Sequence, residues 1–164
     1  MNLLPLPLAP ERIVPQAGTG KTGKRSPCQA RVLLVEDHEP NILVVTTYLE
    51  MMGLDFDIAR NGLEAQKKIA KGSYAVVLMD IQMPVMDGLV STCQIRARER
   101  KERLPRLPII GMTAFMVGGD RQRCLNVGMD EYISKPIDLK ELESKVLAIL
   151  NSPADGAHRP GKNR

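Results

Sequence analysis

Short apolar runs alternate with amphipathic stretches from about residue 30 to residue 151. Five of these runs predict β-strands, namely Arg31–Val35, Asp55–Ala59, Ala75–Asp80, Pro108–Met112 and Glu131–Ser134. Apolar residues at helical spacing predict a helix after each strand, at about residues 39–52, 62–71, 88–101, 119–126 and 139–150. Strands that alternate with helices indicate an α/β fold with a parallel sheet covered by helices on both faces.

Residues typical of helix ends support these boundaries. Gly53, Gly72 and Gly128 each come just after a predicted helix, where a residue with a left-handed backbone often ends the helix. Asp138 precedes the last helix and Glu141 follows three positions later, a spacing typical of a capping box. We therefore expect three left-handed glycines and a capped start of the last helix.

The two ends of the chain lack this periodicity. Residues 1–29 are rich in Pro, Gly, Lys and Thr and are interpreted as a flexible lead-in, and residues 152–164 as a flexible tail. The remaining stretch, residues 30–151, is long enough for one domain with a single core.

The formal net charge of +4 invites a nucleic-acid-binding interpretation, so the position of the charge matters. Residues 30–151 contain 16 Lys and Arg against 17 Asp and Glu, and the basic excess lies in the two ends. A near-neutral folded part argues against a nucleic-acid-binding face. No apolar run has the length of a membrane span. We therefore expect no nucleic-acid partner and no membrane contact by this chain.

The cysteines bear on the compartment. Cys28, Cys93 and Cys124 show no motif spacing, which is typical of free thiols in a reducing environment. Cys93 and Cys124 fall in apolar periodic segments, so we expect both to pack in the core. This usage favours a cytoplasmic location, which could be the cytoplasmic end of a membrane-bound protein.

Polar side chains stand where the predicted strands end. They are Glu36 and Asp37 after the first strand, Asp80 at the end of the third, Thr113 after the fourth and Lys135 after the fifth. Ligands of open parallel sheets bind beyond the carboxyl ends of the strands, so these side chains should converge on one edge. Three neighbouring carboxylates repel one another unless a cation lies among them. Oxygen ligands from few residues favour Mg²⁺ as that cation.

The stretches "LLVEDHEPN", "VLMDIQMPVMDG", "GMTA" and "DEYISKP" occur in this order, each at the end of a predicted strand. Together they resemble the receiver domain of two-component response regulators, of the type found in hybrid sensor histidine kinases. The resemblance covers residues 30–151. It implies a doubly wound (βα)5 fold whose five parallel strands follow the flavodoxin-like order 2-1-3-4-5.

The resemblance also implies a phosphorelay function. Asp80 would take a phosphoryl group from a phosphohistidine on a partner. Mg²⁺ would be held by Glu36, Asp37 and Asp80 and by the backbone carbonyl of Gln82. Lys135 would pair with a phosphoryl oxygen, so that positioning and electrostatics drive the transfer. The partner would be a histidine kinase, a histidine phosphotransfer protein or both, with the chain itself a monomer or weak dimer and not a separate enzyme.

Other positions acquire roles from the same resemblance. Thr113 would hydrogen-bond the phosphoryl group, and Tyr132 would swing inward when Thr113 moves; Tyr132 could equally be an ordinary strand aromatic. Pro136 typically follows a cis peptide bond in these domains. Phe115 stands where many relatives have Asn or His. Because it borders the path of a hydrolytic water and lacks a polar group, it would prolong the life of the phosphorylated state.

Three alternatives remain to be weighed. A phosphatase of the haloacid dehalogenase type also uses a strand-end Asp and Mg²⁺, but it needs a second Asp two positions later, where this chain has Gln82. A transcription factor would need a DNA-binding domain, for which the 13 residues after 151 are too few. The third alternative, a stand-alone receiver, stays open beside a receiver excised from a hybrid kinase.

The first predicted helix offers a candidate docking residue. We expect its core face to be formed by Val45, Tyr48, Leu49 and Met52, with Ile42 and Val44 at the margins. The opposite side should be polar and include Thr46 and Thr47. Leu43 falls among these polar residues. It is either an isolated exposed leucine, which is common, or an anchor for a helical phosphotransfer partner.

Overall fold

The computed structural model describes residues 30–114 and 120–152. These residues form a five-stranded parallel sheet in the order β2-β1-β3-β4-β5. The strands are β1 (Arg31–Val35), β2 (Asp55–Ala59), β3 (Val76–Asp80), β4 (Ile109–Thr113) and β5 (Glu131–Ser134). The helices are α1 (Glu39–Met51), α2 (Gly62–Lys71), α3 (Gly88–Glu102), α4 (Asp120–Asn126) and α5 (Leu139–Asn151). The predicted fold class and strand order are confirmed.

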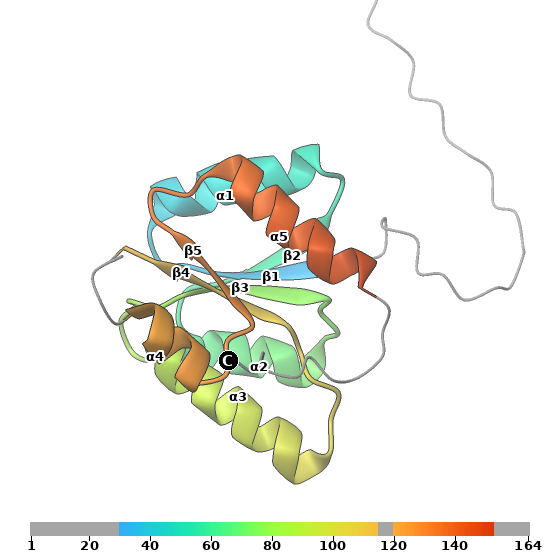
Figure 1. The fold of residues 1–164 in the computed structure, drawn as a ribbon, viewed down its shortest axis with the longest axis vertical. Coiled ribbons are helices and arrows are strands. Elements are labelled where there is room, and N and C mark those ends of the chain that lie inside the picture. The colour runs from blue at the N-terminus through green and yellow to red at the C-terminus, as the bar shows by residue number, and fades with distance from the viewer. Residues whose placement is uncertain (1–29, 115–119, 153–164) are drawn as a thin grey trace, which may run out of the picture.

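The helices cover both faces of the sheet (Figure 1). On one face, α1 and α5 pack against alternate residues of the central strands, and the shared core includes Leu34, Leu49 and Leu142. On the other face, α2, α3 and α4 pack against the remaining alternate residues, around Met79 and Ile95. Because both faces are covered, β3 and β4 are buried along their whole length, which explains their unbroken apolar sequence.

Strand register places the candidate site. Val35 pairs with Met79 across β1 and β3, so the residues that follow, Glu36 and Asp80, leave the sheet side by side. Thr113 pairs with Ser134 across β4 and β5, one residue before Lys135. Strands β1, β3, β4 and β5 therefore bring polar residues at their ends to the same edge.

The helix-end predictions are confirmed in part. Gly53 and Gly128 have φ values of 69° and 96°, the left-handed conformation expected after a helix. Gly72 is extended, with a φ of −120°, so that prediction is wrong; its N–H still bonds the Lys68 carbonyl as the helix ends. The Asp138 carboxylate accepts hydrogen bonds from two backbone N–H groups at the start of α5, as a capping residue does.

The predicted face of α1 needs a correction. Thr46 is buried, not part of an outer polar side, because its hydroxyl donates to the Ile42 carbonyl at 2.8 Å and so satisfies itself within the helix. Ile42 lies in the core, whereas Val44 is exposed. The buried stripe is therefore turned by part of a turn from the predicted one. Leu43 stays on the outside, with 67% of its surface exposed.

The prediction for the cysteines is wrong for one of two described residues. Cys124 is buried between α4 and the sheet, but Cys93 is exposed on α3. The inner face of α3 is instead partly occupied by Ser91, Thr92 and Arg96, all of them buried. A helix whose inner face carries polar residues weakens the apolar periodicity on which the prediction rested.

Candidate functional site

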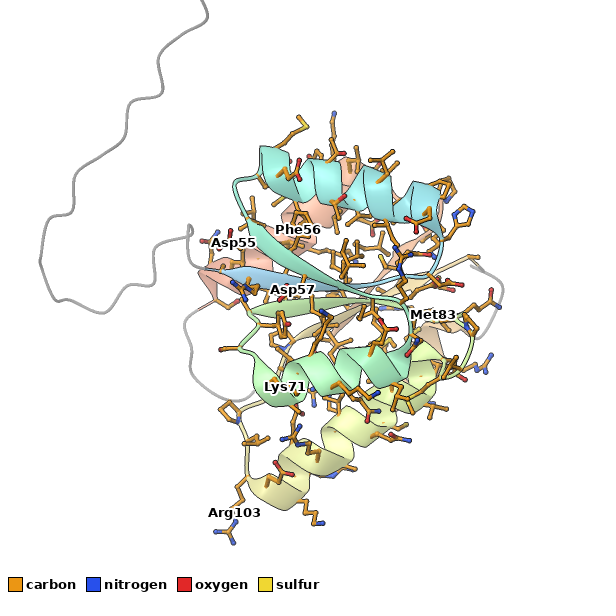
Figure 2. The ribbon with its side chains drawn as sticks, turned by 180° about the vertical axis from the view of Figure 1, so that it is seen from behind. Asp55, Phe56, Asp57, Lys71, Met83 and Arg103 are labelled. Carbon is orange, nitrogen blue, oxygen red and sulfur yellow. The ribbon has the colours of Figure 1, made fainter. Side chains whose placement is uncertain are left out.

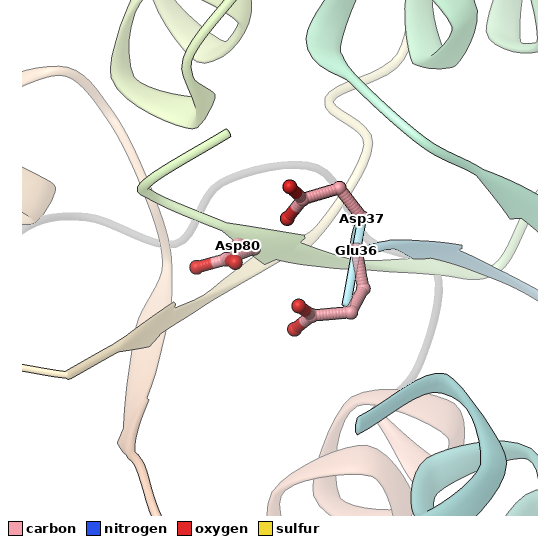
Figure 3. Close-up of side chains that lie close together, drawn as sticks. All are labelled: Glu36, Asp37 and Asp80. Atoms are coloured by element: carbon pink, nitrogen blue, oxygen red, sulfur yellow. The ribbon is translucent and has the colours of Figure 1, made fainter. Parts of the chain in front are cut away.

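Three carboxylates meet at the carboxyl edge of the sheet. Glu36 and Asp37 directly follow β1, and Asp80 is the last residue of β3. One carboxylate oxygen from each lies within 4.8 Å of the others, and Figure 3 shows the three side chains gathered at this edge. Glu36 is fully buried and Asp80 is 4% exposed, whereas Asp37 is more open to solvent. The sequence-predicted acid cluster therefore exists as a spatial cluster.

Lys135 lies between two of the carboxylates. Its ammonium nitrogen is 2.7 Å from Asp80 Oδ2 and 2.7 Å from Glu36 Oε2. Lys135 follows β5 and Asp80 ends β3. The two residues meet because β3 and β5 both pair with β4, which lies between them in the sheet. Three carboxylates against one ammonium leave an excess of two negative charges.

The site environment shifts the pKa of both partners. Burial of Asp80 raises its pKa; the hydrogen bond from Lys135 opposes this, and the nearby Glu36 charge adds to it. Burial of Lys135 by itself lowers its pKa, but hydrogen bonds to Asp80 and Glu36 outweigh burial and leave the pKa raised. The ammonium is thus held charged next to a carboxylate that is costly to ionise.

Further hydrogen bonds fix the acids. Glu36 Oε1 accepts from the His38 backbone N–H and from Asn41 Nδ2, each at 3.2 Å. Asp80 Oδ1 accepts from the backbone N–H of Gln82 at 3.3 Å. Asn41 was missed by the sequence reasoning, although its place in the first turn of α1 is close to the preceding loop. Gln82 borders the site through its backbone, and the ligand role of its carbonyl stays a prediction.

Thr113 and Pro136 frame Lys135. Thr113 ends β4 and is 5% exposed, and its carbonyl accepts the Lys135 N–H at 2.6 Å. The Lys135–Pro136 peptide bond is cis, the geometry that the resemblance implied. Thr113 also lines a hollow of about 420 Å³ together with Gln82 and Arg123 of α4.

Two further residues were predicted to belong to the site, Tyr132 and Phe115. Tyr132 lies on β5 with a half-buried side chain, and its ring faces two cations, Lys145 at 5.0 Å and Arg121 at 5.7 Å from the ring centre. These two cations were missed, since they come from α5 and α4, which lie on opposite faces of the sheet. Phe115 lies outside the described residues.

The donor set fits a divalent cation. Carboxylate oxygens are the ligands that Mg²⁺ prefers, and the cluster offers one from each of three residues. The excess of two negative charges left by Lys135 equals the charge of one such ion. Glu36, Asp37 and Asp80 are therefore the residues that could hold Mg²⁺.

The strand order defines a doubly wound α/β domain, and the acid cluster lies at the carboxyl edge of its sheet, where ligands of such domains bind. The family model for the response regulator receiver domain matches residues 32–147. The chain belongs to this family, whose members are signalling domains of two-component systems.

Related proteins and similar solved structures support the same family assignment. The sensor protein GacS of Pseudomonas syringae pv. syringae is 38% identical over 84% of this chain, which spans 15% of that protein's length. The receiver domain of sensor histidine kinase PA1611 from Pseudomonas aeruginosa, solved with a magnesium ion in its active-site cleft, is 35% identical with a TM-score of 0.67; the match covers 75% of this chain and 98% of that one.

A third similar structure comes from a complex. It joins the histidine phosphotransfer protein Ypd1 of Saccharomyces cerevisiae to the receiver domain of Ssk1; the match is 28% identical with a TM-score of 0.67 and covers 71% of this chain and 86% of that one. Several relatives of this chain are hybrid histidine kinases.

Among the described helices, none combines the length and apolar character needed to cross a membrane.

Proposed function

We propose that this chain is the phosphoacceptor receiver of a two-component phosphorelay and takes a phosphoryl group from phosphohistidine onto Asp80. The observation that carries the proposal is the contact of Lys135 with both Asp80 and Glu36, beside a third carboxylate. This arrangement supports the proposal because it would let Asp80 act as nucleophile beside a cation and the acids that would hold a metal ion.

The transfer is a substitution at phosphorus. An Asp80 carboxylate oxygen forms the new O–P bond while the P–N bond of the phosphohistidine breaks. The bonding pair leaves with the imidazole nitrogen, which regains a proton, and the product is an acyl phosphate on Asp80. Lys135 pairs with a phosphoryl oxygen, and Thr113, at the end of the neighbouring strand, donates its hydroxyl to another. Positioning and charge therefore provide the catalysis.

Mg²⁺ would be held by Glu36, Asp37 and Asp80, with the Gln82 carbonyl as a further ligand, and would supply positive charge for the phosphoryl oxygens. The acid cluster and its charge excess support this assignment. The requirement is open to a direct test, because chelation of divalent ions should abolish the labelling described below.

Tyr132 and Thr113 would transmit the change. They lie on adjacent strands, with Gly111 as the β4 partner of Tyr132 in the register. Two cations, Lys145 and Arg121, lie over the half-buried Tyr132 ring. Movement of Thr113 toward a phosphoryl group would alter the space beside β5 into which the ring can turn.

The partners would be a histidine kinase, a histidine phosphotransfer protein or both. The similarity to hybrid histidine kinases supports a chain that is the receiver part of such a kinase; a stand-alone receiver is the alternative. The receiver of Ssk1, whose structure is similar, was solved in complex with a phosphotransfer protein. Leu43, exposed on α1 two residues after Asn41, which contacts the acid cluster, is the proposed anchor for such a partner.

The decisive experiment is labelling with a small phosphodonor. Phosphoramidate with Mg²⁺ should add the mass of one phosphoryl group, removable by hydroxylamine, and D80N should not be labelled. The matched control is D55N, since Asp55 is an exposed carboxylate at the start of β2, away from the acid cluster. Labelling of D80N to the level of the unchanged chain would overturn the proposal.

A further inference from the structure

A hollow of about 520 Å³ lies between α2 and α3, on the face of the molecule seen in Figure 2. Its floor is apolar and is formed mainly by Leu63, Ile69, Ile95, Leu104 and Leu107. Leu63 and Leu104 are each more than a third exposed. The hollow shares no residue with the acid cluster, and it runs toward the loop that precedes β4, at the amino edge of the sheet.

Cations surround this floor. Lys67 and Arg98 line the hollow itself. Lys71 is the last residue of α2 and Arg103 directly follows α3, the two helices that line the hollow (Figure 2). Arg100 adds a further exposed cation on α3. Arg98 pairs with Glu102 at 3.0 Å, and the Glu99 carboxylate that lines the hollow pairs with Arg96. The other four cations form no ion pair within the described residues. In a folded part whose overall charge is close to zero, this is a local basic excess.

We propose that the α2–α3 hollow binds an amphipathic helix of a partner protein, one that carries apolar anchors flanked by carboxylates. The surface is complementary to such a helix in two ways. Burial of apolar side chains against the apolar floor favours binding, and acidic side chains can pair with the unpaired cations of the rim. This is the helix-in-groove mode of recognition.

The dimensions agree with a helix. From Leu63 to Ala70, which also lines the hollow, α2 advances seven residues, or about 10 Å at 1.5 Å per residue. A bound helix that presents anchors at positions i, i+4 and i+7 spans the same length. The volume accommodates a few aliphatic side chains rather than a whole domain.

Other occupants fit the surface less well. A membrane is contacted through apolar side chains that project from the protein, whereas these line a recess. Single-stranded nucleic acid is bound through aromatic side chains on which bases stack, and no aromatic residue lines the hollow. The apolar start of this chain, "MNLLPLPLAP", has no acidic residue to pair with the rim.

A partner bound in the α2–α3 hollow would not block access of a phosphohistidine protein to Asp80. Asp80 and Lys135 are at the carboxyl edge of the sheet, while Leu104 and Leu107 precede β4 at the opposite edge. A partner on α2 and α3 can therefore remain bound while a phosphohistidine protein reaches Asp80. The surface would hold the receiver to a signalling assembly, not switch its chemistry.

A displayed library of helical peptides, randomised at both anchor and flanking positions, is selected for binding to the full chain. We expect enriched peptides to carry aliphatic residues at helical spacing with Asp or Glu beside them. Their affinity should fall at least tenfold for L104E and for K67E. The matched control is L147E, since Leu147 is a similarly exposed leucine on α5. Labelling of Asp80 by phosphoramidate should stay unchanged in all three variants, which shows that they fold.

Backbone amide shifts report where an enriched peptide binds, and they should cluster on α2, α3 and the loop before β4. Parallel measurements use phosphatidylglycerol vesicles, a single-stranded oligonucleotide and a synthetic peptide of residues 1–29. The proposal is overturned if no peptide is enriched, if enriched peptides are basic or bind elsewhere, if L104E retains them, or if one of these three probes occupies the hollow more tightly.

Discussion

A side chain at Gly88 would collide with the backbone carbonyl oxygen of Asp80. Gly88 is the first residue of α3 and is buried, and its own N–H donates to the Ile81 carbonyl at 3.0 Å. The start of α3 is thus packed directly against the strand end that carries the proposed nucleophile. The two ends of the short loop that joins β3 to α3 are therefore in contact with each other beside Asp80.

Gly88→Ala should therefore damage both stability and site. The added methyl group meets backbone rather than a flexible side chain, so the strand end or the helix must move, at a cost of about 2 kcal/mol or more of unfolding free energy. Phosphoramidate labelling of Asp80 should slow as well. Denaturant unfolding and labelling rate are the measurements. Val90→Ala, an exposed position two residues further along α3, should leave both nearly unchanged; equal effects of the two substitutions would contradict the close-packing account.

Asp37→Asn should raise thermal stability in the absence of metal. Glu36 and Asp80 are paired with Lys135, whereas the Asp37 carboxylate forms no hydrogen bond or ion pair within residues 30–114 and 120–152. Removing its charge relieves repulsion among the three acids. The same change should weaken Mg²⁺ binding. Melting temperature in EDTA and a Mg²⁺ titration measure the two effects, with D55N as control, and a lower metal-free melting temperature for D37N would speak against the repulsion argument.

Leu43→Ala tests the docking proposal for α1. Leu43 is 67% exposed, so its truncation should hardly change stability or labelling by a small phosphodonor. Transfer from a cognate phosphohistidine protein should slow several-fold, because an apolar anchor is lost only in that encounter. The matched control is Met51→Ala, an even more exposed apolar residue at the far end of α1. If transfer is unaffected by L43A, the residue is not an anchor; if both reactions fall, the fold is damaged.

Arg96→Leu should destabilise the fold strongly. Arg96 is 3% exposed, and its guanidinium donates two hydrogen bonds to Glu99, one to Asp130 and one to the Gly128 carbonyl. Its loss leaves Glu99 buried without a counter-charge, which typically costs about 3–5 kcal/mol. Arg98→Leu removes an exposed pair with Glu102 and should cost less than about 1 kcal/mol. Denaturant unfolding distinguishes the two, and comparable losses would show that the Arg96 network contributes little.

Tyr74 predicts a dependence of stability on alkaline pH. Burial and the hydrogen bond to Asp57 raise the pKa of Tyr74 to about 12, from its ordinary value of 10.0. The folded state therefore holds this proton more tightly than the unfolded state. The contribution to stability is complete below pH 10 and is lost as the pH rises toward 12.

The measurement is the difference in unfolding free energy between the unchanged chain and Tyr74→Phe. It should favour tyrosine at neutral pH, because phenylalanine leaves Asp57 without this donor, and it should shrink between pH 10 and 12. The difference isolates Tyr74 from Tyr48 and Lys145, whose pKa values are also raised. A difference that stays constant over this range would contradict the assignment.

The sequence by itself determined the order of the elements and most of their bounds. Apolar runs such as "AVVLM" that alternate with helices are typical of a parallel sheet buried on both faces, in which the residues after the strands lie at one edge. Glu36, Asp37, Asp80, Thr113 and Lys135 could be predicted as neighbours for this reason alone. Leu43 could be placed outside α1 for a related one, since 3.6 residues per turn fix which side faces the core to within part of a turn.

Only the tertiary structure decided how polar groups are paired inside the fold. In the sequence, Arg96 looks like one more surface charge on a basic helix. The neighbouring residues do not reveal that its guanidinium bonds Asp130 and the Gly128 carbonyl in the folded chain. Thr46 reads as polar and exposed, yet it is buried because its hydroxyl finds a carbonyl within the helix. Hydrophobic periodicity records which side of an element avoids water. The cost of burying a polar group depends on partners that the chain brings from far away, and those partners exist only once it has folded.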